Sequence, residues 1–202
     1  MKIIGITGPS GSGKSLLCRS LEQKQVFCID ADKVYHSLLV PPSECLLAIR
    51  DAFGDGVIAS DGSLDRAALG AVVFGDEKKL ELLNETVLER VIGRIRDMIA
   101  DLQNDGAKVV AVDAPTLVES GFDKECDIVI SVIASADERR KRIIERDSIS
   151  PERADARIKA QKSDEFYISH SDYVIENNGS AEQFKKAIEA LLCALLGEGS
   201  DD

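Results

Sequence analysis

One stretch decides the fold of this chain of 202 residues: Gly8-Pro9-Ser10-Gly11-Ser12-Gly13-Lys14-Ser15. It satisfies the pattern G-x-x-x-x-G-K-[ST], whose glycines let backbone N–H groups approach phosphate oxygens closely. A short run rich in β-branched residues, 2–7, precedes the stretch, and leucines at helical spacing follow it. We therefore expect a strand, a phosphate-binding loop and a helix whose N-terminus attracts anions.

Each part of this loop has an expected role toward a nucleotide. Lys14 would neutralise the β- and γ-phosphates, and the hydroxyl of Ser15 would bind Mg²⁺. A dinucleotide-binding pattern starting at Gly11 fails, because Leu16 stands where G-x-G-x-x-G requires its third glycine. The residues expected to bind ATP all belong to the loop and the first helical turn: Gly8, Gly11, Ser12, Gly13, Lys14, Ser15 and Leu16.

Four further apolar runs predict the other strands of the sheet: 26–29, 109–112, 128–133 and 173–175. Runs that are apolar at nearly every position, instead of at every second one, suit parallel strands, because helices bury both faces of a parallel sheet. The predicted fold class is therefore α/β, a P-loop NTPase with a five-stranded parallel sheet flanked by helices.

The whole chain is predicted to be a single domain with a nucleotide-binding core, a helical insertion and a helical lid. Apolar residues recur at helical spacing through the insertion, and Ser150 is expected to cap a second helix of the lid that starts at Pro151. The predicted bounds are 1–202 for the domain, 1–32, 106–136 and 163–202 for the core, 33–105 for the insertion and 137–162 for the lid.

Composition excludes several classes of protein. The net charge of −11 argues against nucleic acid and anionic membranes as partners, since both attract clustered Lys and Arg. No apolar run approaches the roughly 20 residues that a membrane span needs. The five cysteines form no Cys-x-x-Cys pair, so we expect reduced thiols and a cytoplasmic location.

Three aspartates follow predicted strands, at the edge where open α/β sheets bind ligands. Either Asp30 or Asp32 could face an acceptor hydroxyl, although Asp32 could instead cap the helix that begins near Lys33. Asp113 ends the run 109–112 and would act on Mg²⁺ through water, as the carboxylate of a P-loop enzyme does. The alternative for Asp113 is a turn before Pro115.

A run of charged residues, 137–147, predicts a helix with arginines on one face. Arg139, Arg142 and Arg146 share that face at i, i+3 and i+7. Their guanidinium groups could bind phosphate oxygens in pairs, whereas a charged helix face with no ligand is the alternative. Because this helix follows a strand in a chain with a phosphate-binding loop, we favour phosphate binding.

The sequence lacks the Asn-Lys-x-Asp motif of guanine-binding switches, which favours a small-molecule kinase. Blocks spread over residues 3–180 then resemble the dephospho-coenzyme A kinase family. They are Gly5-Ile-Thr-Gly8, Ile29-Asp-Ala-Asp32, Asp61-Gly-Ser-Leu-Asp65-Arg66, Val73-Phe74, Asp113-x-Pro115, Leu117, Glu119-Ser-Gly121, Arg142, Arg146-Asp147, Arg157-Ile-x-x-Gln161, Asp172-Tyr-Val-Ile175 and Asn177-Asn-Gly-Ser180.

The resemblance implies transfer of the γ-phosphoryl group of ATP to the ribose 3′-hydroxyl of dephospho-coenzyme A, the last step of coenzyme A synthesis. It also implies a fold like that of nucleoside-monophosphate kinases, with Mg²⁺ accompanying ATP and the insertion binding the acceptor. The residues implied are, for catalysis, Asp32, Lys14, Arg142 and Arg146; for the adenine side of ATP, Asn177 and Gly179; for the acceptor, Asp32, Asp65, Arg66, Pro115, Leu117 and Glu119; and for the metal, Ser15 and, through water, Asp113.

One departure from the family lies in the insertion. Leu88-Glu89 stands where the family usually has a His-Pro pair, so an uninterrupted helix is expected there. Two alternatives therefore stay open, a kinase for another small acceptor such as a nucleoside monophosphate, and a nucleotide-binding regulator that transfers no phosphate. The expected partners are ATP and dephospho-coenzyme A, and the expected assembly is a monomer or a weak homo-oligomer.

Overall fold

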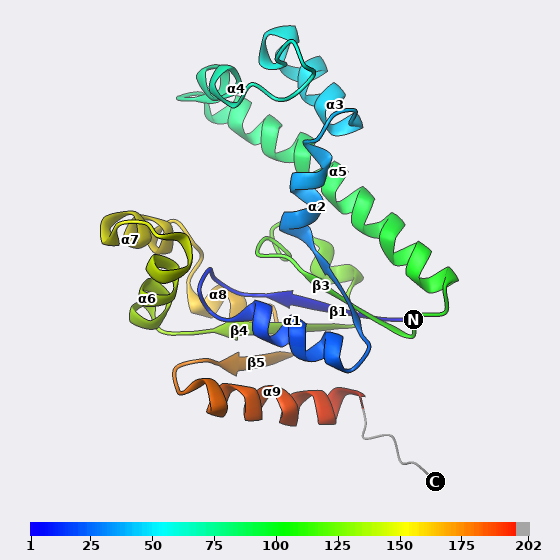
Figure 1. The fold of residues 1–202 in the computed structure, drawn as a ribbon, viewed down its shortest axis with the longest axis vertical. Coiled ribbons are helices and arrows are strands. Elements are labelled where there is room, and N and C mark those ends of the chain that lie inside the picture. The colour runs from blue at the N-terminus through cyan, green and yellow to red at the C-terminus, as the bar shows by residue number, and fades with distance from the viewer. Residues whose placement is uncertain (197–202) are drawn as a thin grey trace. The chain divides into compact units, whose positions relative to one another are not determined.

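All five predicted strands form one sheet in the computed structural model, which describes residues 1–196. The sheet order is β2-β3-β1-β4-β5, and β1 pairs in parallel with both β3 and β4 (Figure 1). The predicted five-stranded parallel sheet is confirmed. The strand bounds are Lys2–Thr7 for β1, Phe27–Asp30 for β2, Val109–Asp113 for β3, Ile128–Ile133 for β4 and Tyr173–Glu176 for β5.

The second strand begins one residue later than predicted. The backbone N–H of Val26 donates to the carbonyl oxygen of Leu21 at 3.1 Å, so Val26 closes the turn after the first helix instead of joining the sheet.

The chain divides into two compact units, and each is described by itself. The first comprises Met1–Ile29 with Asp105–Asp202, and the second is Asp30–Asn104. The nucleotide-binding role of the core, the acceptor-binding role of the insertion and the role of the lid stay predictions.

Helices of the first unit bury the apolar faces of its sheet. Ile4 and Ile6 of β1 pack in one core cluster with α1 and α9, to which Leu17 and Phe184 contribute. The helix bounds are Lys14–Gln23 for α1, Ala136–Asp147 for α6, Pro151–Lys159 for α7, Asp164–Ser169 for α8 and Ala181–Leu196 for α9, with a short 3₁₀ turn, η2, at Phe122–Glu125. As predicted, Ser150 caps α7, where its hydroxyl accepts from the N–H of Arg153 at 3.4 Å.

The second unit is helical and has its own core, which includes Leu46, Ile49 and Leu69. Its elements are α2 at Ala31–Leu38, α3 at Glu44–Phe53, η1 at Asp55–Val57, α4 at Arg66–Val73 and α5 at Glu77–Asn104. The uninterrupted helix expected at Leu88-Glu89 is confirmed, because α5 continues through both residues without a break.

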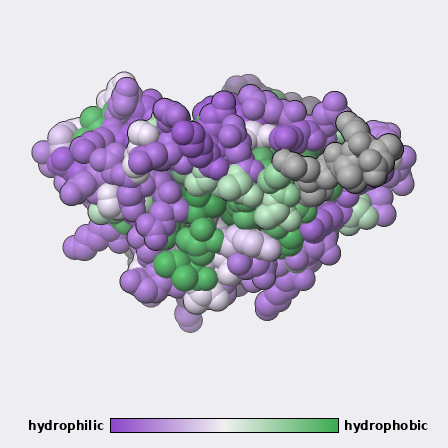
Figure 2. All heavy atoms as spheres, turned by 90° about the horizontal axis from the view of Figure 1, so that it is seen from below, coloured by the Kyte–Doolittle hydropathy of each residue, from purple (hydrophilic) through white to green (hydrophobic). Residues whose placement is uncertain are grey.

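The surface of the first unit includes an exposed edge strand. Tyr173 and Val174 of β5 are exposed, and Figure 2 shows apolar residues among hydrophilic ones on the face seen from the α9 side. Within residues 1–196, no helix combines the length and apolar character needed to cross a bilayer.

Candidate functional site

The phosphate-binding loop, Gly8 to Ser15, joins β1 to α1 and needs its glycines for two reasons. Gly8 and Gly13 have φ of 131° and 114°, a backbone region that side chains disfavour. A Cβ at Gly8 would also collide with the backbone oxygen of Val132, and one at Gly13 with the side-chain amide of Asn177. Neighbouring β-strands and turns therefore hold the loop closely.

Lys14, the first residue of α1, lies over this loop. Its ammonium donates to the carbonyl oxygens of Gly8 and Pro9, at 2.8 and 3.4 Å. The helix N-terminus contributes partial positive charge beside this ammonium. The predicted strand, loop and helix thus place a cation beside the N-terminus of α1, as phosphate binding requires.

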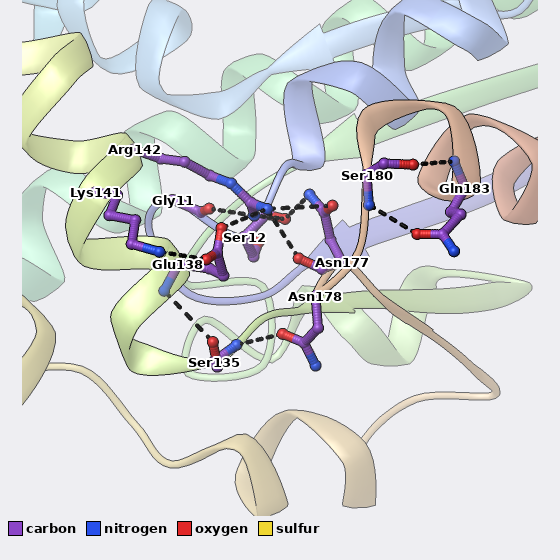
Figure 3. A network of polar contacts seen from close by, with 10 residues as sticks. All are labelled: Gly11, Ser12, Ser135, Glu138, Lys141, Arg142, Asn177, Asn178, Ser180 and Gln183. Atoms are coloured by element: carbon purple, nitrogen blue, oxygen red, sulfur yellow. Dashed lines mark hydrogen bonds and ion pairs between the residues drawn. The ribbon is translucent and has the colours of Figure 1, made fainter.

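Arg142 of α6 forms hydrogen bonds with the phosphate-binding loop (Figure 3). It donates to the carbonyl oxygens of Gly11 and Ser12, at 3.2 and 3.4 Å, and to the backbone oxygen of Asn177 at 2.9 Å. Glu138, one turn earlier on α6, lies 3.6 Å from the same guanidinium. Because its donors engage the carbonyl oxygens of Gly11 and Ser12, Arg142 fixes the position of this part of the loop.

Asn177, in the turn after β5, completes this arrangement, which we call the Arg142–Asn177 clamp. Its side chain is buried and donates to the carbonyl oxygen of Ser12 at 2.7 Å. The next residue, Asn178, accepts the N–H of Ser135 at 2.7 Å and so joins the same turn to the start of α6 (Figure 3). The turn predicted to border adenine therefore also supports the phosphate-binding loop.

Arg146 reaches the loop from one turn further along α6. Its guanidinium donates to the hydroxyl of Ser10 at 3.3 Å and pairs with Asp147, with Nε 2.7 Å from Oδ1. Asp147 also accepts from Arg157 of α7. Hydrogen bonding by Arg146 is the main reason that the pKa of Asp147 falls to about 2, and Arg157 adds to it.

Arg139 differs from the other two arginines on the predicted face. Only 5% of it is exposed, and it points to Gln161 and Asp164, with both hydrogen bonds at 3.4 Å. The expectation of one common phosphate-binding face thus needs correction. Helical spacing places the three Cα atoms on one side, but Arg139 lies beneath the segment that leads from α7 into α8.

Ser15 and Asp113 provide oxygen ligands of the kind that Mg²⁺ prefers. Ser15 lies in the first turn of α1, and Asp113 ends β3 opposite Ile6, two residues before Gly8. The thiol of Cys18, one turn after Ser15, donates to Oδ2 of Asp113 at 3.5 Å. Sequence reasoning missed Cys18, because no sequence signal connects positions so far apart.

The structure separates the roles of Asp30 and Asp32. Asp30 caps α2, where Oδ1 accepts the N–H of Lys33 at 3.0 Å and Oδ2 lies 3.4 Å from its ammonium. The capping alternative considered for Asp32 therefore belongs to Asp30. Asp32 lies exposed in the first turn of α2, two residues after β2 ends.

The residues expected to bind the acceptor lie in both units. In the second unit, Asp65 caps α4 by accepting the N–H groups of Ala67 and Ala68, at 3.0 and 2.9 Å, and Arg66 is exposed beside it. In the first unit, Pro115 and Glu119 lie in the segment after β3.

Leu117, in the same segment, is fully buried. A Cβ built on Gly5 would lie 2.7 Å from Cδ2 of Leu117, so this side chain packs on β1. Leu117 thus anchors the segment after β3 to the core by packing against β1.

Comparisons with known proteins give a consistent result. A family model described as dephospho-CoA kinase matches residues 2–183. A dephospho-CoA kinase of Symbiobacterium thermophilum is 38% identical over 202 residues, which cover 100% of this chain and 84% of that protein. A solved structure from Thermus thermophilus has a TM-score of 0.79 at 31% identity, over 97% of this chain and 98% of that one. A dephospho-CoA kinase structure from Campylobacter jejuni, 24% identical, shares the fold with a TM-score of 0.69 over 96% of this chain and 98% of that one.

Proposed function

We propose, because this chain belongs to the dephospho-CoA kinase family, that its phosphate-binding loop, Asp32 and the arginines of α6 perform the reaction of that family. The reaction transfers the γ-phosphoryl group of ATP to the ribose 3′-hydroxyl of dephospho-coenzyme A, giving coenzyme A and ADP in the last step of coenzyme A biosynthesis. A kinase for a nucleoside monophosphate and a non-catalytic regulator are not favoured, since the family match extends over nearly the whole chain.

The observation that supports this proposal most directly is the Arg142–Asn177 clamp. Three hydrogen bonds to the carbonyl oxygens of Gly11 and Ser12 hold the loop in one conformation before phosphate binds. Donors held in place before the reaction stabilise developing charge without the cost of reorganisation. Lys14 adds a positive charge where the β- and γ-phosphates would lie.

Asp32 is proposed as the base for the acceptor hydroxyl. Its carboxylate would accept the 3′-hydroxyl proton as the oxygen attacks the γ-phosphorus. The same family resemblance supports a role in binding the acceptor for four residues: Asp65, Arg66, Pro115 and Glu119. Leu117 would contribute indirectly, by holding the segment after β3 in place from the core.

The donor set of Ser15 and Asp113 fits Mg²⁺, which commonly binds one or two carboxylates together with substrate phosphates. When bound with ATP, Mg²⁺ would supply positive charge that offsets the charge of the phosphates. Ser15 would bind it directly, and Asp113 would hold one of its waters. A monomer or weak homo-oligomer in the cytoplasm stays a prediction.

The test is ADP release from the purified protein with Mg-ATP. We expect release with dephospho-coenzyme A, little release without an acceptor or with nucleoside monophosphates, and none in Lys14→Ala. Release that is equal with and without dephospho-coenzyme A, or highest with a nucleoside monophosphate, would contradict the proposal.

A further inference from the structure

Two cysteine side chains from different elements meet beside the proposed metal ligand. Cys18 lies on α1 and Cys28 on β2. The thiol of Cys28 donates to the backbone carbonyl oxygen of Cys18, with the sulfur 3.4 Å from that oxygen. Both residues are partly exposed, and both are free thiols.

The two thiols have different surroundings. The thiol of Cys18 donates to Oδ2 of Asp113, 3.5 Å away. Cys28 lies on β2, an edge strand of the sheet. Because the thiol of Cys18 is engaged by the Asp113 carboxylate, we assign the first reaction with the oxidant to Cys28.

We propose that Cys18 and Cys28 are a reversible modification site, at which a hydrogen peroxide-class oxidant joins their sulfurs in a disulfide and lowers the activity of the phosphate-binding loop site. The contact between the Cys28 sulfur and the Cys18 carbonyl oxygen makes the two residues neighbours before any reaction, so we expect side-chain rotation to suffice for closing the bond. The effect on activity rests on the proposed kinase function.

The reaction has two steps. Hydrogen peroxide transfers one oxygen to the Cys28 sulfur, which gives a sulfenic acid, and its other oxygen leaves as water. The Cys18 sulfur then attacks the Cys28 sulfur, the S–OH bond breaks, and the departing hydroxide takes the Cys18 proton as a second water. Together the thiols lose two protons and two electrons, and one peroxide becomes two waters.

The disulfide would alter the site through Asp113. A disulfide sulfur carries no hydrogen, so Cys18 can no longer donate to Oδ2 of Asp113, 3.5 Å away. The new bond would also tie α1, which begins at Lys14 and includes Ser15, to β2. Both changes affect groups that position ATP and its metal.

The experiment compares reduced and oxidised protein. Kinase activity is first measured under reducing conditions, where failure would count against the proposed function alone. The protein is then treated with hydrogen peroxide, free thiols are alkylated, and peptides are mapped by mass spectrometry. We expect a Cys18–Cys28 linked peptide, about a tenfold loss of activity, as for a lost hydrogen bond to a charged group, and recovery with dithiothreitol.

Two variants make the result decisive. Cys28→Ser should keep the basal activity and resist peroxide, whereas Cys193→Ser, which changes an exposed cysteine, should remain as sensitive as the natural protein. Three results would overturn the proposal: no Cys18–Cys28 peptide when peroxide has modified Cys193, full activity of the linked protein, or peroxide inactivation of Cys28→Ser at the natural rate.

Discussion

Two neighbouring aspartates at the end of β2 differ in what they contact. Asp30 is engaged as the cap of α2, with Lys33 bonded to both of its oxygens, whereas Asp32 is exposed in the first helical turn. A residue that caps a helix has little freedom to take up a proton from a substrate. The contacts thus favour Asp32 as the proposed base.

Asp32→Asn is expected to lower kcat by about 10²- to 10⁴-fold, the usual contribution of a general base. The KM for ATP should change little, because the variant leaves the phosphate-binding loop intact. Steady-state kinetics with each substrate varied would measure both. Asp30→Asn is the matched control, since asparagine still caps a helix. Near-normal turnover in Asp32→Asn would remove Asp32 from this role.

Asn177→Ala tests the clamp at a single buried residue. The variant leaves the Ser12 carbonyl oxygen without its 2.7 Å donor, so the loop should bind phosphate less well. We expect the KM for ATP to rise about tenfold, with a smaller change in kcat, from the loss of a buried hydrogen bond. Asn178→Ala, which removes a contact to Ser135 instead, should have a weaker effect. Equal effects in both variants would argue against the clamp.

At the scale of elements, α6 and α7 are joined by charge. Asp147 at the end of α6 pairs with Arg146 of its own helix and with Arg157 of α7. Ion pairs at exposed positions contribute little individually, but two arginines on one carboxylate fix its geometry. The link holds α7 against the helix that carries Arg142.

Because the pKa of Asp147 is lowered to about 2, its ion pairs should persist through the acid range in which most carboxylates titrate. Their contribution to stability is fully present above the usual aspartate pKa of about 4 and is lost as pH falls through about 2. An NMR titration would measure this pKa. In Arg157→Gln it should rise only in part, since Arg146 remains. A pKa near 4 in the natural protein would contradict the expectation.

At the scale of the whole molecule, the chain inserts one compact unit into another. The first unit holds the phosphate-binding loop and the clamp, while the second, Asp30–Asn104, has its own helical core and carries Asp32, Asp65 and Arg66. A unit with a separate core can bind its own ligand without disturbing the other. Substitutions at Asp65 or Arg66 of the second unit should therefore affect the acceptor and leave ATP binding unchanged.

Arg66→Ala provides the test of this division. The exposed guanidinium is expected to bind an anionic group of dephospho-coenzyme A, so its loss should raise the KM for that substrate about tenfold. The Kd of ATP, measured by calorimetry without acceptor, should stay unchanged. Arg50→Ala, another arginine of the same unit, serves as control. A weaker affinity for ATP in Arg66→Ala would contradict the division.

The sequence by itself determined the elements whose signals are local. The phosphate-binding loop follows from eight adjacent residues, the strands from continuous apolar runs, and the start of α7 from Ser150-Pro151, because each signal depends on backbone preferences and burial within a short segment. The family followed from motifs of the same kind, which were specific enough together to indicate the reaction.

Only the tertiary structure decided which side chains meet. Arg139 and Arg142 share a helix face, yet one is buried against Gln161 while the other binds the loop, because different segments cover successive turns of α6. Asn177 reaches Ser12 across 165 positions, a contact that no local pattern encodes. Periodicity specifies the direction of a side chain, but the neighbour that it meets depends on how distant segments pack.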